Sequence, residues 1–207
     1  ALHYGVRSIP AVKAFSQAEV VGEFTGLQPE ARIREFLARI TPPSPLALAM
    51  EKATSLLQDQ QWAESESLFR DLLDQVPQQP EALLGLAMTL LGQGYGHEAQ
   101  VILKGFPPSR EYARAQQLLP LADALAKSES GELPEDNDLD AAYANSVRLA
   151  GRGNLPSALD GLLEILRQNK NYRQGTARQV FLALLELLGP NDPQSRAYRS
   201  ELAAILF

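Results

Sequence analysis

The stretch Gly92-Gln93-Gly94-Tyr95-Gly96 lies between two segments whose apolar residues recur at helical spacing. Glycine readily takes the left-handed conformation in which many helices end, so this stretch predicts a tight turn between two helices. The same organisation occurs 34 residues earlier, where Asp59-Gln60-Gln61 lies between two further amphipathic segments. At that offset residues 46–79 align with residues 80–113 without a gap, which indicates an internal repeat.

A helix–turn–helix unit that repeats every 34 residues is typical of tetratricopeptide repeats, and this chain resembles that family. A third, weaker unit is predicted at residues 139–169, around the turn Gly151-Arg152-Gly153-Asn154. Such a solenoid needs about three units for stability and has atypical helices at its ends. Further helices are expected at residues 109–127, 176–188 and 194–207. The sequence therefore predicts a mainly α fold built on an α-helical, tetratricopeptide-like solenoid.

The first forty residues follow another pattern. Residues 11–15 and 20–24 are short β-type runs, and residues 33–40 then carry apolar side chains at helical spacing. Together with the preceding Tyr4-Gly5-Val6-Arg7-Ser8-Ile9-Pro10, this ββα unit resembles the C-terminal half of thioredoxins. The resemblance implies that Pro10 is a cis-proline and that Ile9, the residue before it, contacts a bound peptide.

The half of a thioredoxin that carries the dithiol is missing from this sequence, and the chain has no cysteine. Thiol–disulfide exchange by this chain is therefore excluded. We expect the chain to be a truncated or cleaved piece of a longer protein. We also expect the exposed edge of the hairpin to self-associate with another copy.

Prolines and acidic residues mark the expected domain boundaries, because proline ends helices and favours extended spacers. The expected segments are the partial thioredoxin-like domain at 1–40, a Pro-rich linker at 41–45, repeats one and two with an extra helix at 46–127, an acidic loop at 128–138, and repeat three with capping helices at 139–207.

Composition excludes several function classes. A net charge of −6 with dispersed basic residues argues against nucleic acid, and no apolar run is long enough for a membrane span. Two distant histidines and no cysteine leave no metal site, cofactor site or catalytic constellation, so we predict no enzyme activity. Asp136, Asp138 and Asp140 alternate as in a calcium loop but lack the glycine and terminal glutamate of one, so a solvated loop is expected.

What is left is surface for protein partners. Repeats that clamp a C-terminal carboxylate use Lys and Asn at set positions of their first helices, and those positions here hold Met50, Thr54, Leu84, Met88, Tyr143 and Val147. An apolar groove that binds hydrophobic segments is therefore predicted, with Met50, Leu84, Met88 and Tyr143 as partner-binding residues. The alternative, that these side chains pack as core between helices, stays open.

The last predicted helix, residues 194–207, offers a second apolar face. This face consists of Tyr198, Leu202, Ile205 and Leu206, and Phe207 ends the chain. All five are predicted partner-binding residues. It either caps the solenoid or enters a groove of a partner.

A thioredoxin-like unit, a Pro-rich linker and degenerate tetratricopeptide repeats occur in this order in bacterial chaperedoxins, which the chain resembles. The resemblance implies a cytoplasmic co-chaperone or holdase with roles in stress response and cell redox homeostasis. Such a protein binds unfolded clients and hands them to the chaperonin GroEL and to DnaK-type chaperones, and its last helix docks on the chaperonin. Two alternatives stay open: a fragment of a thiol-disulfide oxidoreductase with its dithiol upstream of Ala1, and a tetratricopeptide assembly scaffold without chaperone activity.

Overall fold

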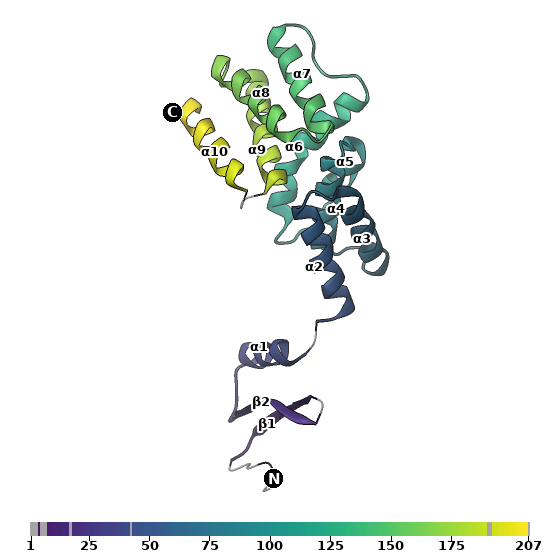
Figure 1. Ribbon diagram of the computed structural model, residues 1–207, viewed down its shortest axis with the longest axis vertical. Coiled ribbons are helices and arrows are strands. Elements are labelled where there is room, and N and C mark those ends of the chain that lie inside the picture. Colours follow the sequence, from purple (N-terminus) through teal and green to yellow (C-terminus); the bar gives the residue numbers. More distant parts are fainter. Residues whose placement is uncertain (1–3, 5–7, 17, 42, 190–191, 207) are drawn as a thin grey trace. The chain divides into compact units, whose positions relative to one another are not determined.

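The computed structural model describes residues 4, 8–16, 18–41, 43–189 and 192–206. The chain forms two compact units, residues 1–48 and 49–207. Within the described residues the fold is mainly α, with one small antiparallel sheet of two strands (Figure 1). This confirms the predicted fold class.

The first unit is a ββα arrangement of strands β1 (Ala11–Ser16) and β2 (Glu19–Thr25) and helix α1 (Glu30–Ile40). The strands pair in antiparallel register and are longer than predicted, so the turn between them is shorter than the four residues expected. The ring of Phe36 meets the ring of Phe24 edge-on at 5.1 Å. No described residue of this unit is fully buried.

The peptide bond between Ile9 and Pro10 is cis, and the carbonyl oxygen of Pro10 accepts a hydrogen bond from the Gly26 amide at 2.7 Å. The middle of the motif before it, residues 5–7, lies outside the described residues.

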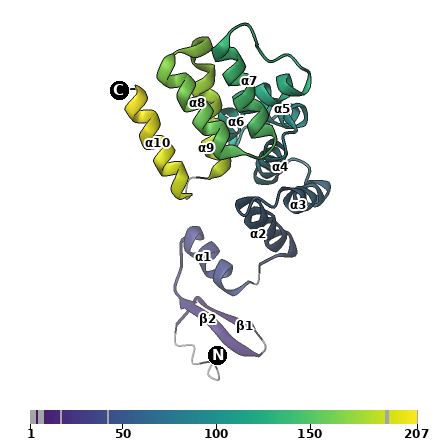
Figure 2. The same ribbon diagram turned by 45° about the horizontal axis from the view of Figure 1, so that its top comes forward.

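Helices make up the second unit and follow one another as hairpins. They are α2 (Pro45–Gln58), α3 (Trp62–Gln75), α4 (Pro80–Gly92), α5 (Gly96–Lys104), α6 (Tyr112–Glu129), α7 (Asp138–Gly151), α8 (Leu155–Gln168), α9 (Thr176–Leu188) and α10 (Pro193–Leu206), with the short 3-10 helix η2 (Tyr172–Gly175) before α9. Pairs α3–α4, α4–α5 and α7–α8 pack together, while α6 lies against both α5 and α9 (Figure 2). Helix α6 extends two residues beyond the predicted end at residue 127 and α7 begins at Asp138, so the acidic loop is shorter than expected.

Equivalent turns share one left-handed residue. Gly94 (φ 85°) lies between α4 and α5, and Gly153 (φ 76°) lies between α7 and α8. In the first unit of the repeat the same place is taken by Gln60 (φ 56°), although side chains other than glycine disfavour this conformation. The turn is therefore set by the helix pairing rather than by glycine alone.

Two glycines of α4 allow α3 and α4 to approach closely. A Cβ on Gly85 would lie 2.2 Å from the ring of Phe69, and one on Gly92 would lie 2.6 Å from the indole of Trp62. These contacts let the aromatic side chains of α3 lie directly on the backbone of α4, so the close packing of the first repeats depends on both partners.

The prediction that Asp140 lies in a solvated loop is wrong. Asp140 lies on α7, and only 2% of its surface is exposed. Its carboxylate accepts two hydrogen bonds from the guanidinium of Arg173, both 2.9 Å long, and one from the hydroxyl of Tyr172 at 2.5 Å. The hydrogen bonds from Arg173, and after them the one from Tyr172, lower the pKa of Asp140 to about 2. The cluster ties α7 to η2, where Arg173 and Gln174 both have left-handed backbones.

Candidate protein-interaction groove

Three predicted partner-binding residues from two helices line one hollow in the second unit. Met50 comes from α2, and Leu84 and Met88 come from successive turns of α4. The hollow has a volume of about 660 Å³, within the range of about 300–1,000 Å³ typical of ligand sites. We call it the apolar groove. Its uncharged lining consists of Met50, Thr54, Leu57, Gln58, Phe69, Leu84, Gly85, Met88, Leu187, Leu188 and Gly189.

The local sequence explains why these side chains meet. Leu84 and Met88 are four residues apart, so they lie on the same face of α4. Both are nearly buried, at 4% and 7% exposure, whereas Met50 is half-buried. The hydroxyl of Thr54, which also lines the groove, donates to the carbonyl of Met50 at 2.8 Å. These residues pack between helices and also line a hollow, so partner binding by them stays a prediction.

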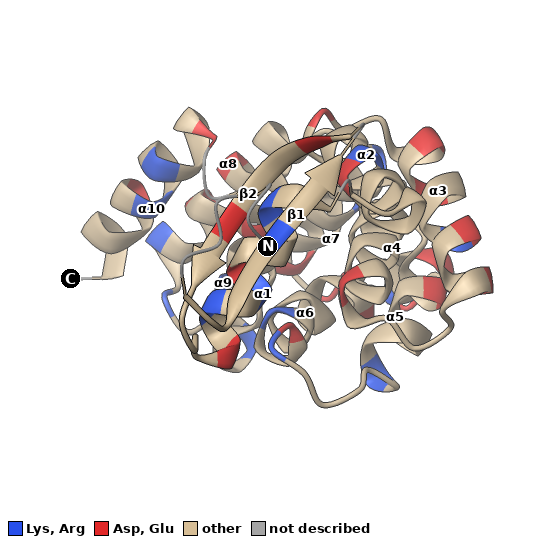
Figure 3. Ribbon diagram, turned by 90° about the horizontal axis from the view of Figure 1, so that it is seen from below, with Lys and Arg blue, Asp and Glu red and all other residues tan. Residues whose placement is uncertain are grey.

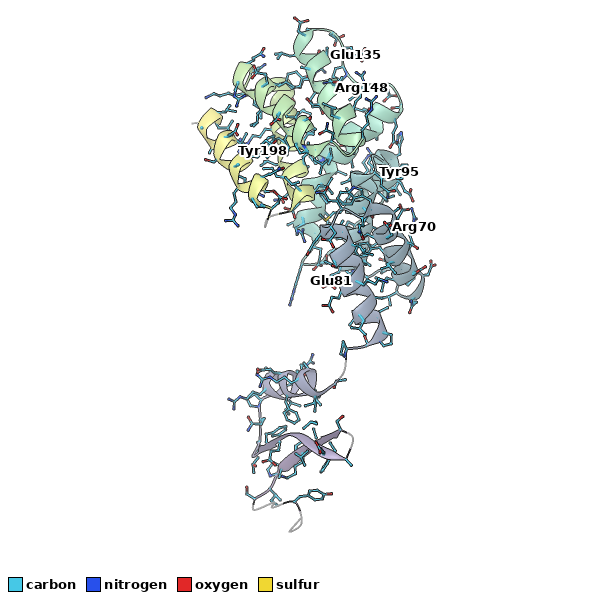
Figure 4. All side chains as sticks on the ribbon, in the orientation of Figure 1. Arg70, Glu81, Tyr95, Glu135, Arg148 and Tyr198 are labelled. Atoms are coloured by element: carbon cyan, nitrogen blue, oxygen red, sulfur yellow. The ribbon has the colours of Figure 1, made fainter. Side chains whose placement is uncertain are left out.

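Charged residues complete the lining, and no pattern in the sequence marks them as part of a site. They are Glu81, Glu111, Arg114, Glu186 and Asp192. Arg114 on α6 pairs with Glu186 on α9 at 2.6 Å, which joins two helices far apart in sequence. Glu81 lies in the first turn of α4, where a carboxylate favours the positive helix end (Figure 4). The sequence signals a helix start there, but only the fold places the carboxylate beside the groove.

Tyr143 is not in the apolar groove. It lines a separate hollow of about 630 Å³ with residues of α6, α9 and the loop before α7. Its side chain is 4% exposed and its ring lies 5.4 Å from that of Tyr172. Burial raises the pKa of Tyr143 to about 12. The structure therefore separates this residue from the other three predicted on the repeats.

The apolar face of α10 packs on its own solenoid. Leu202 is 6% exposed, and the ring of Tyr198 meets that of Phe181 on α9 at 6.2 Å. The hydroxyl of Tyr198 donates to Asp160 on α8 at 2.9 Å (Figure 4). Burial first, and then this hydrogen bond, raise the pKa of Tyr198 to about 12.

The end of α10 is less enclosed, since Ile205 and Leu206 are half-buried. Phe207 lies outside the described residues. In the first unit, Ile9 is 90% exposed and Pro10 is also exposed.

Charges of both signs are distributed over the helices (Figure 3). Across the described part of the chain, no group of three or more His, Asp or Glu side chains is arranged to hold a metal ion. Within the same residues, no helix combines the length and hydropathy that crossing a membrane requires.

Comparison with known families identifies the repeats. Two family models, both of the tetratricopeptide repeat, match residues 56–122 and 114–207. The chain therefore contains tetratricopeptide repeats, which generally mediate contacts between proteins. Both matching families are thus of a kind that binds other proteins.

Similar proteins do not add a function. An uncharacterized protein of Haemophilus influenzae is 24% identical over all of this chain and 99% of its own length. Uncharacterized proteins of Mycobacterium tuberculosis and Mycobacterium bovis are 21% identical over 99% of this chain, which spans 63% of their length. A domain of unknown function from Vibrio parahaemolyticus matches 77% of this chain and 98% of its own, at 23% identity and a TM-score of 0.33, which is too low to support an argument.

Proposed function

We propose that the protein is a co-chaperone or holdase whose apolar groove binds hydrophobic segments of unfolded or partly folded proteins. The observation that carries this proposal is the hollow of about 660 Å³ beside Met50, Leu84 and Met88. Methionine side chains are flexible and polarizable, so a surface that contains them adapts to different apolar segments.

The resemblance to chaperedoxins supports three further parts of the proposal. Residues 1–40 correspond to half of a thioredoxin domain, and Ile9 and Pro10 contact peptide there. The end of α10, with Ile205 and Leu206, docks on the chaperonin GroEL, and DnaK-type chaperones also receive clients. A cytoplasmic location belongs to the same proposal. Exposure of Ile9 and the half-buried state of Ile205 and Leu206 are consistent with contacts at these places.

The groove is tested by the suppression of aggregation of a chemically denatured client. Met50→Gln preserves the length of the side chain, and glutamine also favours helix, but the substitution makes the groove wall polar. Suppression of client aggregation should therefore weaken about threefold or more. The matched control is Leu48→Gln on the same helix, because Leu48 is 50% exposed and does not line the groove. Equal suppression by both variants and the unmodified protein would exclude the groove as the client site. Failure of the unmodified protein to suppress aggregation would favour the assembly scaffold.

Chaperonin docking is tested separately by a pull-down with purified GroEL. Ile205→Ser with Leu206→Ser should reduce retention, whereas Arg196→Ser, on the exposed side of α10, should not. Undiminished retention of the double variant would remove the docking role of α10.

A further inference from the structure

The charges around the apolar groove are strongly unbalanced. Four carboxylates line it, from Glu81, Glu111, Glu186 and Asp192, against the single cation of Arg114. Arg114 is already bound to Glu186 at 2.6 Å. Within the described part of the chain, the other three carboxylates form no ion pair.

These three carboxylates come from separate elements that the fold brings to one opening. Glu81 is in the first turn of α4, Glu111 precedes α6, and Asp192 precedes α10. Like charges gathered around an apolar hollow create a negative potential that attracts cations and repels anions. Complementary charge of this kind selects partners and speeds their association.

The negative potential also restricts which segment can occupy the groove. An acidic segment would place its charges beside carboxylates that no cation neutralises, which is unfavourable. Of these, the carboxylate of Asp192 accepts a hydrogen bond from the Gln194 amide at 2.7 Å. A second copy of this chain, with a net charge of −6, is disfavoured for that reason. A polypeptide segment with apolar side chains flanked by Lys or Arg satisfies both the apolar wall and the rim.

We infer that the apolar groove is selective for basic amphipathic segments of partner proteins, held by apolar contacts with Met50, Leu84 and Met88 and by ion pairs with Glu81, Glu111 and Asp192. The inference rests on the proposed function, since it names the chemistry of the segments that the groove binds. Affinity should fall as salt is added, because exposed ion pairs are screened.

Fluorescence anisotropy with the full chain and three labelled synthetic peptides tests this selectivity. The peptides share one set of leucine and phenylalanine anchors and carry Lys, Gln or Glu at the flanking positions. The Lys peptide should bind tightest and the Glu peptide weakest. Glu81→Gln with Glu111→Gln should weaken binding of the Lys peptide about three- to tenfold and leave the Gln peptide within about twofold.

The matched control removes two charges from α3, with Glu64→Gln and Asp74→Asn. Glu64 lies in the first turn of α3 as Glu81 does in α4, and neither control residue lines the groove. An equal effect of both double variants would overturn the inference, since it would reflect net charge alone.

The variant Met50→Gln, which changes the groove wall, distinguishes failure of the further inference from failure of the proposed function. If it weakens all three peptides while the three bind equally well, the groove binds apolar segments without charge selection, and only the further inference fails. If no peptide binds, or Met50→Gln changes nothing, the proposed groove itself fails. Tightest binding of the Glu peptide would also overturn the selectivity.

Discussion

Gly96 lies at a contact where α5 meets the end of α6 with no room for a side chain. It is the first residue of α5, and a Cβ placed on it would lie 2.2 Å from the backbone nitrogen of Ala126 and 2.5 Å from the carbonyl carbon of Leu125. Both are backbone atoms of α6, so no rotamer change can relieve the overlap. Ordinary contact begins near 3.4 Å, so Gly96→Ala must move the two helices apart by about 1 Å.

The same movement would break a cap. The carboxylate of Glu129, at the end of α6, accepts hydrogen bonds from the backbone amides of Gly96 and His97, the second at 3.2 Å. Overpacking costs about 1–3 kcal/mol and a lost hydrogen bond about 0.5–1.5 kcal/mol, while alanine gains at most about 1 kcal/mol of helix propensity. We expect a net loss of about 2–3 kcal/mol, or roughly 4–12 °C in Tm for a unit of this size.

Two other glycines separate the contributions. Gly105→Ala adds a Cβ at 3.4 Å from its nearest neighbour, without a left-handed φ, and should change stability by less than about 0.5 kcal/mol. Gly131 has φ 71° and open space around it, so Gly131→Ala measures backbone strain alone, at about 1 kcal/mol.

Urea unfolding of the full chain is followed by far-UV circular dichroism and by the fluorescence of Trp62, the single tryptophan, which packs on α4. If Gly96→Ala loses no more stability than Gly105→Ala at an unchanged m-value, the argument from close backbone packing is wrong.

Three further outcomes are expected. The pKa of Asp140 is depressed from 3.8 to about 2, so its contribution to stability is complete above about pH 4 and is lost as the pH falls toward 2. Asp140→Asn should therefore lower Tm at pH 6, and its difference from the unmodified protein should shrink between pH 4 and pH 2; a difference independent of pH would contradict this. Gln60→Gly should raise Tm by about 1–4 °C in a thermal melt, since the left-handed backbone at φ 56° favours glycine, and a lower Tm would refute the strain. Tyr198→Phe removes the hydrogen bond to Asp160 and should cost about 0.5–1.5 kcal/mol by urea unfolding. A spectroscopic titration should lose one phenol near pH 12, and loss of a phenol near the ordinary pH 10 instead would contradict the assignment.

Much of the helical architecture was predictable because it is local. The period of 34 residues and the glycine turns gave the helix pairs, and α9 runs from Thr176 to Leu188 as expected. The ends of helices were predicted less accurately where no capping residue marked them. Helix α6 continues past Lys127 to Glu129 because the carboxylate of Glu129 is used to cap α5, a partner more than thirty residues away.

The proposed binding surface was predictable only in part. The positions at which other repeats clamp a carboxylate pointed to Met50, Leu84 and Met88, and the structure brings these three residues to one hollow. The same positions grouped Tyr143 with them, but the structure places it at a different hollow, so its role in binding stays a prediction. Asp140 was also misjudged, since a carboxylate in an acidic stretch gives no sign of the arginine and tyrosine that bury it.

The sequence by itself determined the class of the fold, the repeat period and the lack of cysteine in these 207 residues, because helix periodicity and residue identity are properties of the chain alone. Only the tertiary structure decided which carboxylates surround the apolar groove and which glycines are closed to a side chain. Both depend on distances between helices remote in sequence, such as Arg114 to Glu186 and Gly96 to Ala126. Those distances result from packing the whole unit, and no local pattern encodes them.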